Sequence, residues 1–129
     1  MKTLTIRGRS IRDIPSFYAE INRVFMAGED WKLGESLDAF NDLLFGGYGA
    51  IAGPEPVELV WEDIEASRVA LGIDTTRAHL LGKLRQPERY SVAVIQQQLD
   101  RLEGRDGSTY FDTILDIIRE HPNLKLAGR

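Results

Sequence analysis

The chain has 129 residues, of which 43% are hydrophobic, and it carries a formal net charge of −4 at pH 7. This length is enough to bury one core and short for two, so we expect a single domain over residues 1–129. The negative charge argues against direct binding of nucleic acid and favours a basic protein surface as partner.

Cysteine is absent from the sequence. Disulfides, thiolate nucleophiles and zinc ribbons are therefore excluded, which is typical of a protein kept in the reducing cytosol. Neither the N-terminal segment nor any later stretch is apolar over the length that a signal peptide or a membrane span needs. We expect a cytoplasmic protein that does not associate with membranes.

The first half of the chain predicts two strands and two helices. Leu4 and Ile6 alternate with the β-branched Thr3 and Thr5, which is the pattern of a half-buried strand over residues 3–7. The other predicted elements are an amphipathic helix over 13–25, a helix over about 35–45, a glycine- and proline-rich loop over 46–56 and a buried strand over 57–61.

The second half predicts further helices and a closing strand. Gly72 suits the left-handed conformation that ends a helix, here one over 62–71. The remaining signals are caps at Asp74, Thr75 or Thr76 for a helix through Leu84, an apolar stripe of Ile95, Leu99 and Leu102 ending at Gly104, a last helix capped by Ser108 or Thr109 and stopped by Pro122, and a strand over 124–126.

Strands that are separated by helices pair in parallel, because a tight turn cannot join parallel strands. The predicted fold class is therefore α/β, with a small three-stranded parallel sheet packed by helices.

The helix over about 35–45 carries an acidic stripe. Its apolar residues Leu37, Phe40 and Leu44 share one face, and Glu35, Asp38 and Asp42 follow on a neighbouring face that is expected to meet solvent. Like charges four residues apart cost about 0.2–0.5 kcal/mol in a helix, so we expect no contribution of Asp38 and Asp42 to folding.

The last helix repeats this arrangement with Asp112, Asp116 and Glu120. Two acidic ridges on one small domain would form a continuous negative surface. The alternative is that a chain with 20 acidic residues contains such stripes by chance and that both are merely solvated faces.

Three segments resemble the barstar family in the same order. Residues 33–44, LGESLDAFNDLL, are similar to a family motif of an apolar or aromatic residue, a glycine and "ENLDALWDAL". Residues 56–61, PVELVW, resemble the strand "YPLVLEW" that follows that motif, and residues 114–120, ILDIIRE, resemble the C-terminal helix of the family. The resemblance implies a barstar-like fold, a parallel three-stranded sheet with helices.

The resemblance also implies a function. It suggests an intracellular inhibitor that inserts its second helix and adjoining loop into the cleft of a basic, extracellular-type ribonuclease or a related toxin nuclease, as a monomer in a 1:1 complex. By position, the implied contacts are Lys32, Gly34, Ser36, Asp38, Asn41, Asp42, Gly46 and Glu120, with Asp42 at the centre.

This sequence departs from the family pattern at three places. Asn41 stands where the family's helix often has tryptophan, and Lys32 replaces an aromatic residue of the preceding loop, with Trp31 beside it. The segment from Val69 to about Arg105 has no counterpart in short family members, and we interpret it as an inserted helical hairpin that covers the edge of the sheet or the core.

Other candidate sites find little support. Residues 47–52 match G-x-G-x-x-A but lack the strand, turn and helix of a dinucleotide site. His79 and His121 lie on different predicted elements and suit capping or surface roles, so no metal and no cofactor are expected. We place Trp61 in the core. Phe45 and Tyr48 either fill the core beside the loop or form an apolar rim of the interface.

Two alternatives to ribonuclease inhibition stay open at this point. An enzyme would use Asp38, Asp42 and Glu120 as acid–base or metal-binding carboxylates, but such groups need a concave pocket, and a helix surface is convex. We therefore predict no catalytic activity. The second alternative is an acidic adaptor or immunity-type protein that binds another basic protein or a toxin that is not a ribonuclease.

Overall fold

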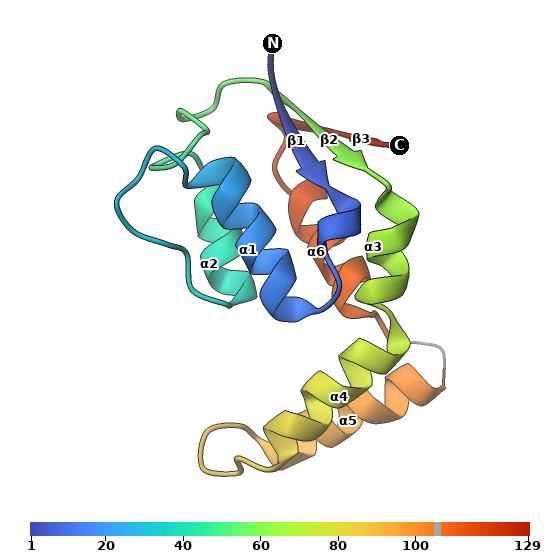
Figure 1. Cartoon of the computed structure of the whole chain (residues 1–129). Helices are drawn as coiled ribbons and strands as arrows, with labels where there is room; N and C mark the ends of the chain where they lie inside the picture. The colour runs from blue at the N-terminus through green and yellow to red at the C-terminus, as the bar shows by residue number, and fades with distance from the viewer. Residues whose placement is uncertain (105–106) are drawn as a thin grey trace.

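The computed structural model describes residues 1–104 and 107–129. Three parallel strands form one sheet in the order β1 (Lys2–Arg7), β2 (Val57–Glu62) and β3 (Leu124–Gly128). The register places Leu4 opposite Leu59, and Leu59 opposite Leu126. The predicted α/β fold with a three-stranded parallel sheet is therefore confirmed (Figure 1).

Six α-helices and one short 3-10 turn connect and cover the strands in the described part of the chain. None of these helices combines the length and the apolar character that crossing a lipid bilayer requires. The bounds are η1 Gly8–Ser10, α1 Ile14–Phe25, α2 Leu37–Leu44, α3 Ile64–Ala70, α4 Ile73–Leu84, α5 Val92–Glu103 and α6 Tyr110–Arg119.

Helix starts follow from local capping chemistry. Asp13 caps α1 and forms a capping box with Ser16, and Thr109 caps α6 in the same way with Asp112. The predicted cap of α4 at Asp74, Thr75 or Thr76 is wrong, because the helix begins directly after Gly72 and these three residues lie inside it. Gly72 has φ −84° and ψ −153°, so it is extended rather than left-handed and serves as the N-cap of α4.

One face of β1 is open to solvent. Ile6 is fully buried and Leu4 packs against the core, whereas Thr3 and Thr5 on the alternate positions are exposed. β2 is the central strand, and Val57, Leu59, Val60 and Trp61 are all buried along it. The strand alternation expected from the sequence is therefore present in β1. In β2, Val57, Leu59 and Trp61 belong to the core cluster, and Val60 is buried on the other face beside the exposed Glu62.

Trp61 lies at the centre of the core and is 0% exposed, as expected. Its ring stacks with Phe17 of α1 at 6.3 Å between centroids and meets Phe111 of α6 edge-on at 5.6 Å. Its indole N–H donates to the Ser67 hydroxyl at 2.9 Å, and that hydroxyl donates to the backbone carbonyl of Gly8 at 3.1 Å. The buried polar atom of the tryptophan is thus satisfied, as burial requires.

A buried carboxylate ties α1 to the end of β1. Glu20 is 4% exposed, accepts a hydrogen bond from the Arg7 backbone N–H at 2.6 Å and pairs with Arg23 through two bonds of 2.8 and 2.7 Å. Burial alone would raise the pKa of Glu20, but the hydrogen bonds from Arg23 and Arg7 outweigh it and hold the pKa below its usual value. The charge is therefore kept at neutral pH and fixes the helix on the strand.

The α4–α5 hairpin lies within the segment interpreted as an insertion, whose expected end at Arg105 is outside the described residues. The expectation that it covers the sheet or the core is wrong. The hairpin projects away from the sheet (Figure 1) and forms a small cluster of its own. Its contact with the main body is between α4 and the start of α6, where the Tyr110 backbone N–H donates to Thr76 at 2.8 Å. The members of the hairpin cluster are Leu80, Ile95, Leu99 and Leu102.

Replacing Ser67 with alanine tests the polar link inside the core. The Ser67→Ala variant leaves the buried indole N–H of Trp61 without an acceptor, so we expect the free energy of unfolding to fall by about 1–3 kcal/mol. Denaturant unfolding measures this loss. Ser10→Ala, at an exposed serine, is the matched control. A loss for Ser67→Ala no greater than that of the control would contradict the role given to this hydrogen bond.

Candidate protein-binding site

Helix α2 presents the acidic residues singled out in the sequence. Ser36 caps it, because its hydroxyl accepts a hydrogen bond from the Ala39 backbone N–H at 3.0 Å. Asp38 and Asp42 are both exposed, on the side away from the fully buried Phe40. The predicted start of the helix at Glu35 is wrong, since Glu35 precedes the cap, and the acidic stripe of α2 consists of Asp38 and Asp42.

The two aspartates differ in their effect on the helix. Asp38 lies in the first turn, where the helix dipole favours a negative charge. The expectation that Asp38 does not contribute to folding is therefore wrong. Asp42 lies near the C-terminal end of this eight-residue helix, where the dipole disfavours a negative charge. In the described residues, no hydrogen bond or ion pair engages the Asp42 side chain, so the fold gains nothing visible from it.

Asn41 and His121 join α2 to the end of α6. The side-chain oxygen Oδ1 of Asn41 lies 2.8 Å from Nε2 of His121 and accepts a hydrogen bond from it when the proton of the imidazole is on Nε2. His121 is 4% exposed, so the expected capping or surface role is wrong. Asn41, expected as a partner contact, is half-buried and committed to this bond, and the exposed Glu120 immediately precedes His121.

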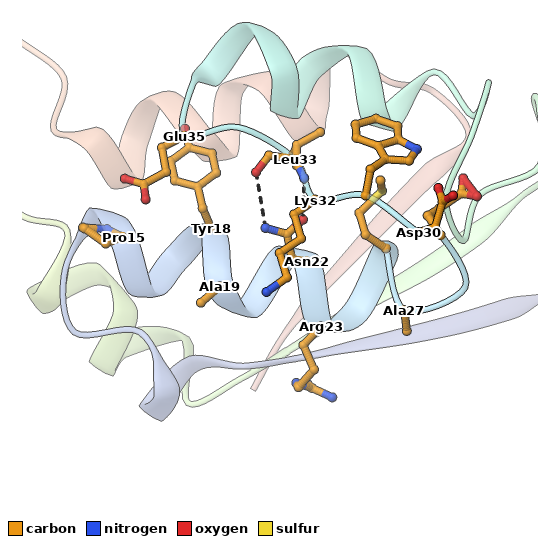
Figure 2. A pocket seen from close by; sticks show the side chains of 13 residues that line it. Pro15, Tyr18, Ala19, Asn22, Arg23, Ala27, Asp30, Lys32, Leu33 and Glu35 are labelled. Carbon is orange, nitrogen blue, oxygen red and sulfur yellow. Dashed lines mark hydrogen bonds between the residues drawn. The ribbon is translucent and has the colours of Figure 1, made fainter.

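The loop between α1 and α2 is held in place at one residue. Leu33 is 5% exposed, its N–H donates to the side-chain oxygen of Asn22 at 2.7 Å, and its carbonyl accepts from the amide of Asn22 at 3.4 Å. Figure 2 shows Leu33 of the loop facing Asn22 of α1. Both residues line a cavity of about 690 Å³ between α1 and the loop. Lys32 and Gly34 on either side are exposed, so the loop offers them to solvent from a fixed point.

The loop after α2 is held by backbone conformation. Gly46 has φ +84°, and a Cβ there would lie 2.5 Å from the Gly53 carbonyl oxygen, so only glycine fits. The Gly53 N–H donates to the Gly46 carbonyl at 2.8 Å and closes the loop. The resemblance implies a partner contact at Gly46, and the structure shows that the backbone conformation of this loop requires glycine there.

Aromatic side chains lie on both sides of α2. Trp31 is 45% exposed and its ring lies 5.0 Å from that of the half-buried Tyr48. Phe45 directly follows α2, is 66% exposed and meets the His121 ring edge-on at 4.7 Å. Phe45 is exposed, as the interpretation of an apolar rim requires, whereas Tyr48 packs partly against the core, as the interpretation of a core residue requires.

The second acidic ridge is only partly present. Asp112 is half-buried and belongs to the capping box of α6, because its carboxylate accepts from the Thr109 backbone N–H at 3.1 Å. Asp116 is exposed and lies 3.9 Å from Arg119, so its charge is partly balanced. Of the three acids expected on this helix, Glu120 alone is exposed with no hydrogen bond or ion pair to its side chain in the described residues.

The remaining candidate residues do not form a metal site. His79 is half-buried, with its ring edge-on to Tyr110 at 5.4 Å, so it packs against α6 and does not cap a helix. Burial lowers the pKa of His79, and nearby Lys83 lowers it further. Within residues 1–104 and 107–129, no three histidine or acidic side chains gather as a metal site would require.

Two positioning residues could not be recognised from the sequence. Asn22 is a polar residue within the amphipathic pattern of α1, and Glu29 accepts a hydrogen bond from the Gly49 N–H at 3.2 Å. Both act on segments that are distant in the chain, and no local spacing signals such a contact.

Comparison with known protein families places most of the chain in a described family. A family model described as Barstar (barnase inhibitor) matches residues 1–82. The match includes α2 and β2 and continues into α4, so it extends beyond Val69, where we expected the family pattern to stop. It leaves out residues 114–120, so the resemblance of α6 stays a prediction. A search of curated proteins found no match.

The buried histidine predicts a loss of stability in weak acid. Burial lowers the pKa of His121 below its usual 6.5, and the neighbouring Glu120 opposes this only in part. Because the unfolded chain then binds the proton more readily, the stabilising contribution is complete above about pH 6.5 and declines as the pH falls below it. His79 acts in the same direction.

Denaturant unfolding at pH values from about 7.5 to about 5 measures this decline, above the range in which the carboxylates titrate. The His121→Gln variant should show a smaller decline than the wild type, and His79→Gln measures the share of the other histidine. Equal pH dependence in the wild type and in a variant lacking both histidines would contradict the assignment.

Proposed function

The chain belongs to the barstar (barnase inhibitor) family, and from this membership we propose that it inhibits a basic ribonuclease by covering the active-site cleft with α2 and its flanking loops. Members of this family are protein inhibitors rather than enzymes. We propose that the chain acts as a monomer in a 1:1 complex in the cytosol, which suits a sequence without cysteine.

The observation that carries the proposal is the position of Asp42. It is exposed on a short helix whose other side is buried, and it lies near the end where the helix dipole opposes its charge. A ribonuclease gathers arginine, lysine and histidine to hold phosphate groups. A carboxylate on a rigid helix can take the place of a phosphate through charge-assisted bonds to arginine.

The surroundings of Asp42 support the same interface. Lys32, Gly34, Ser36 and Asp38 precede it on the loop and the first turn of α2, and all of them are exposed. Beyond the polar contacts implied by the resemblance, the half-exposed ring of Trp31 and the exposed ring of Phe45 supply apolar area, which is typical of the buried anchors of protein interfaces. Glu120, next to the His121 that binds Asn41, adds a third exposed carboxylate to Asp38 and Asp42.

Inhibition of RNA cleavage tests the proposal directly. We expect the chain to inhibit barnase or a basic nuclease that it captures from the lysate of its source, in a ratio of one to one. The chain alone, assayed on the same RNA, is the negative control. Capture of a basic protein with no activity on RNA would favour the broader alternative, an immunity-type protein directed against another toxin.

The Asp42→Ala variant separates binding from folding. We expect the affinity for the nuclease to fall by about 2 kcal/mol or more, a general range for interface hot spots that includes measurements on barstar itself. Stability should stay level or rise by up to about 0.5–1 kcal/mol, because alanine is the better helix former and an unfavourable charge is removed.

Binding titrations and denaturant unfolding give the two values. Glu62→Ala, at an exposed acid on β2, is the matched control, since Asp112→Ala would break the capping box of α6. A loss of stability above about 2 kcal/mol with inhibition unchanged would make Asp42 a structural residue and overturn the proposal.

Association with the nuclease should be fast and should slow as salt is added. The exposed carboxylates of α2 and Glu120 attract a basic cleft over a distance that salt shortens several-fold between about 0.01 and 0.5 M. Stopped-flow mixing over this range measures the association rate constant. A rate that does not change with salt would rule out electrostatic steering, and the Asp42→Ala variant should show a smaller salt dependence than the wild type.

A further inference from the structure

A groove of about 340 Å³ lies between the start of α2 and the α4–α5 hairpin. Its apolar lining includes Leu37 of α2, Leu80 of α4 and Tyr110 of α6. The hairpin adds the imidazole of His79 and the cationic side chains of Lys83 and Arg101 to the lining. No acidic residue lines the groove among the described residues, although the chain as a whole carries a net charge of −4.

The hairpin presents these groups through regular helical spacing. His79 and Lys83 are four residues apart on α4, and Gln98 and Arg101 are three apart on α5, so each pair shares one face of its helix. Val94 lies four residues before Gln98, on the same face of α5, and is 51% exposed. It adds an exposed apolar side chain to that face. Both helices of the hairpin therefore contribute to one wall.

Two acids of the hairpin, Asp74 and Glu103, are paired with Arg77. Arg77 binds Asp74 within α4 at 3.0 Å and Glu103 at 2.5 Å, and the pair with Glu103 links α4 to α5. In the described residues, Lys83 and Arg101 take part in none of the ion pairs, and the Lys83 amine lies 5.2 Å from the ring centre of Tyr90. The side chains that line the groove therefore include two cations and no acid among the described residues, while Glu88 and Asp100 of the hairpin lie outside the lining.

The groove adjoins the proposed inhibitory surface. Leu37, which lines it, is the first residue of α2, and the next residue is the exposed Asp38. We infer that the groove binds an acidic segment, with an apolar residue at its centre, of the same protein that covers α2. This inference rests on the proposed function, because it assigns the hairpin to the same partner. A nuclease seated on α2 would place its basic cleft on the aspartates and an acidic rim segment against Lys83 and Arg101.

A synthetic hexaglutamate peptide tests the chemistry of the groove without a nuclease. In low salt, we expect it to shift the NMR signals of the groove residues on α4, α5 and the start of α6, and to leave Asp38 and Asp42 unchanged. A hexalysine peptide should do the reverse and shift the signals of α2. Opposite responses to the two peptides are expected because the two surfaces carry opposite charge.

The Lys83→Gln/Arg101→Gln variant should lose the shifts caused by hexaglutamate. The matched control is Arg85→Gln/Lys125→Gln, which removes two exposed cations outside the groove. Shifts that survive the groove substitutions, or that spread evenly over all cationic residues, would overturn the inference. Equal shifts from inorganic phosphate at the same ionic strength would also overturn it, in favour of a general anion site.

Barnase serves as the probe nuclease for the link to inhibition. Charge reversal in Lys83→Glu/Arg101→Glu should weaken binding by about tenfold, mainly through slower association, as is typical of charges at the rim of an interface. If this variant inhibits as well as the wild type while Asp42→Ala does not, the role of the groove fails and the proposed function stands. If the wild type does not inhibit barnase but still binds hexaglutamate in the groove, the proposed function fails for this nuclease and the groove chemistry stands.

Discussion

The buried side chain of Trp61 connects the sheet to the surface that we propose as functional. Its ring stacks on Phe17 of α1, and Phe17 in turn meets Phe40 of α2 edge-on at 5.5 Å between centroids. The hydrogen bond from its indole nitrogen to Ser67 fixes α3 to the same point. Because cores are packed as densely as organic crystals, a shift of Trp61 would be transmitted through two rings to α2. The direction in which Asp42 points thus depends on the centre of the sheet.

Helix α2 depends on this support because of its length. Eight residues are too few for a stable isolated helix, since nucleation is unfavourable and few backbone bonds repay it. Its rigidity comes from the burial of Phe40, Leu43 and Leu44 and from the bond of Asn41 to His121. Rigidity matters for a charged contact, because ordering a mobile side chain and its helix on binding would reduce the affinity gained. Asn41, to which the resemblance assigns a partner contact, thus holds α2 in place through its bond to His121.

Much of the fold could be predicted from the sequence, and the failures have a common cause. The strands and the parallel topology follow from local alternation and from the helices between strands, and local patterns determine both. The start of α6 could be predicted to within one residue, with Ser108 or Thr109 as the cap, and the structure assigns the cap to Thr109. The buried state of His121 and the holding of Leu33 by Asn22 could not be predicted, because the partners lie 80 and 11 residues away. The prediction of an acidic ridge on α6 is wrong for Asp112. The prediction treats Asp112 as a free surface charge, whereas its carboxylate accepts a hydrogen bond in the capping box with Thr109.

The hairpin shows why net charge is a coarse guide to a partner. The total of −4 predicts a basic partner, and α2 fits that expectation with two exposed aspartates. The groove beside it has the opposite sign, with Lys83 and Arg101 along a wall free of lining acids in the described residues. Two adjacent surfaces of opposite charge restrict the orientation of a bound protein more than one acidic surface does, because a partner that is rotated on α2 would bring like charges together. A hairpin stabilised by its own small cluster and by the Arg77 pairs can carry this second charge without disturbing the core on which α2 depends.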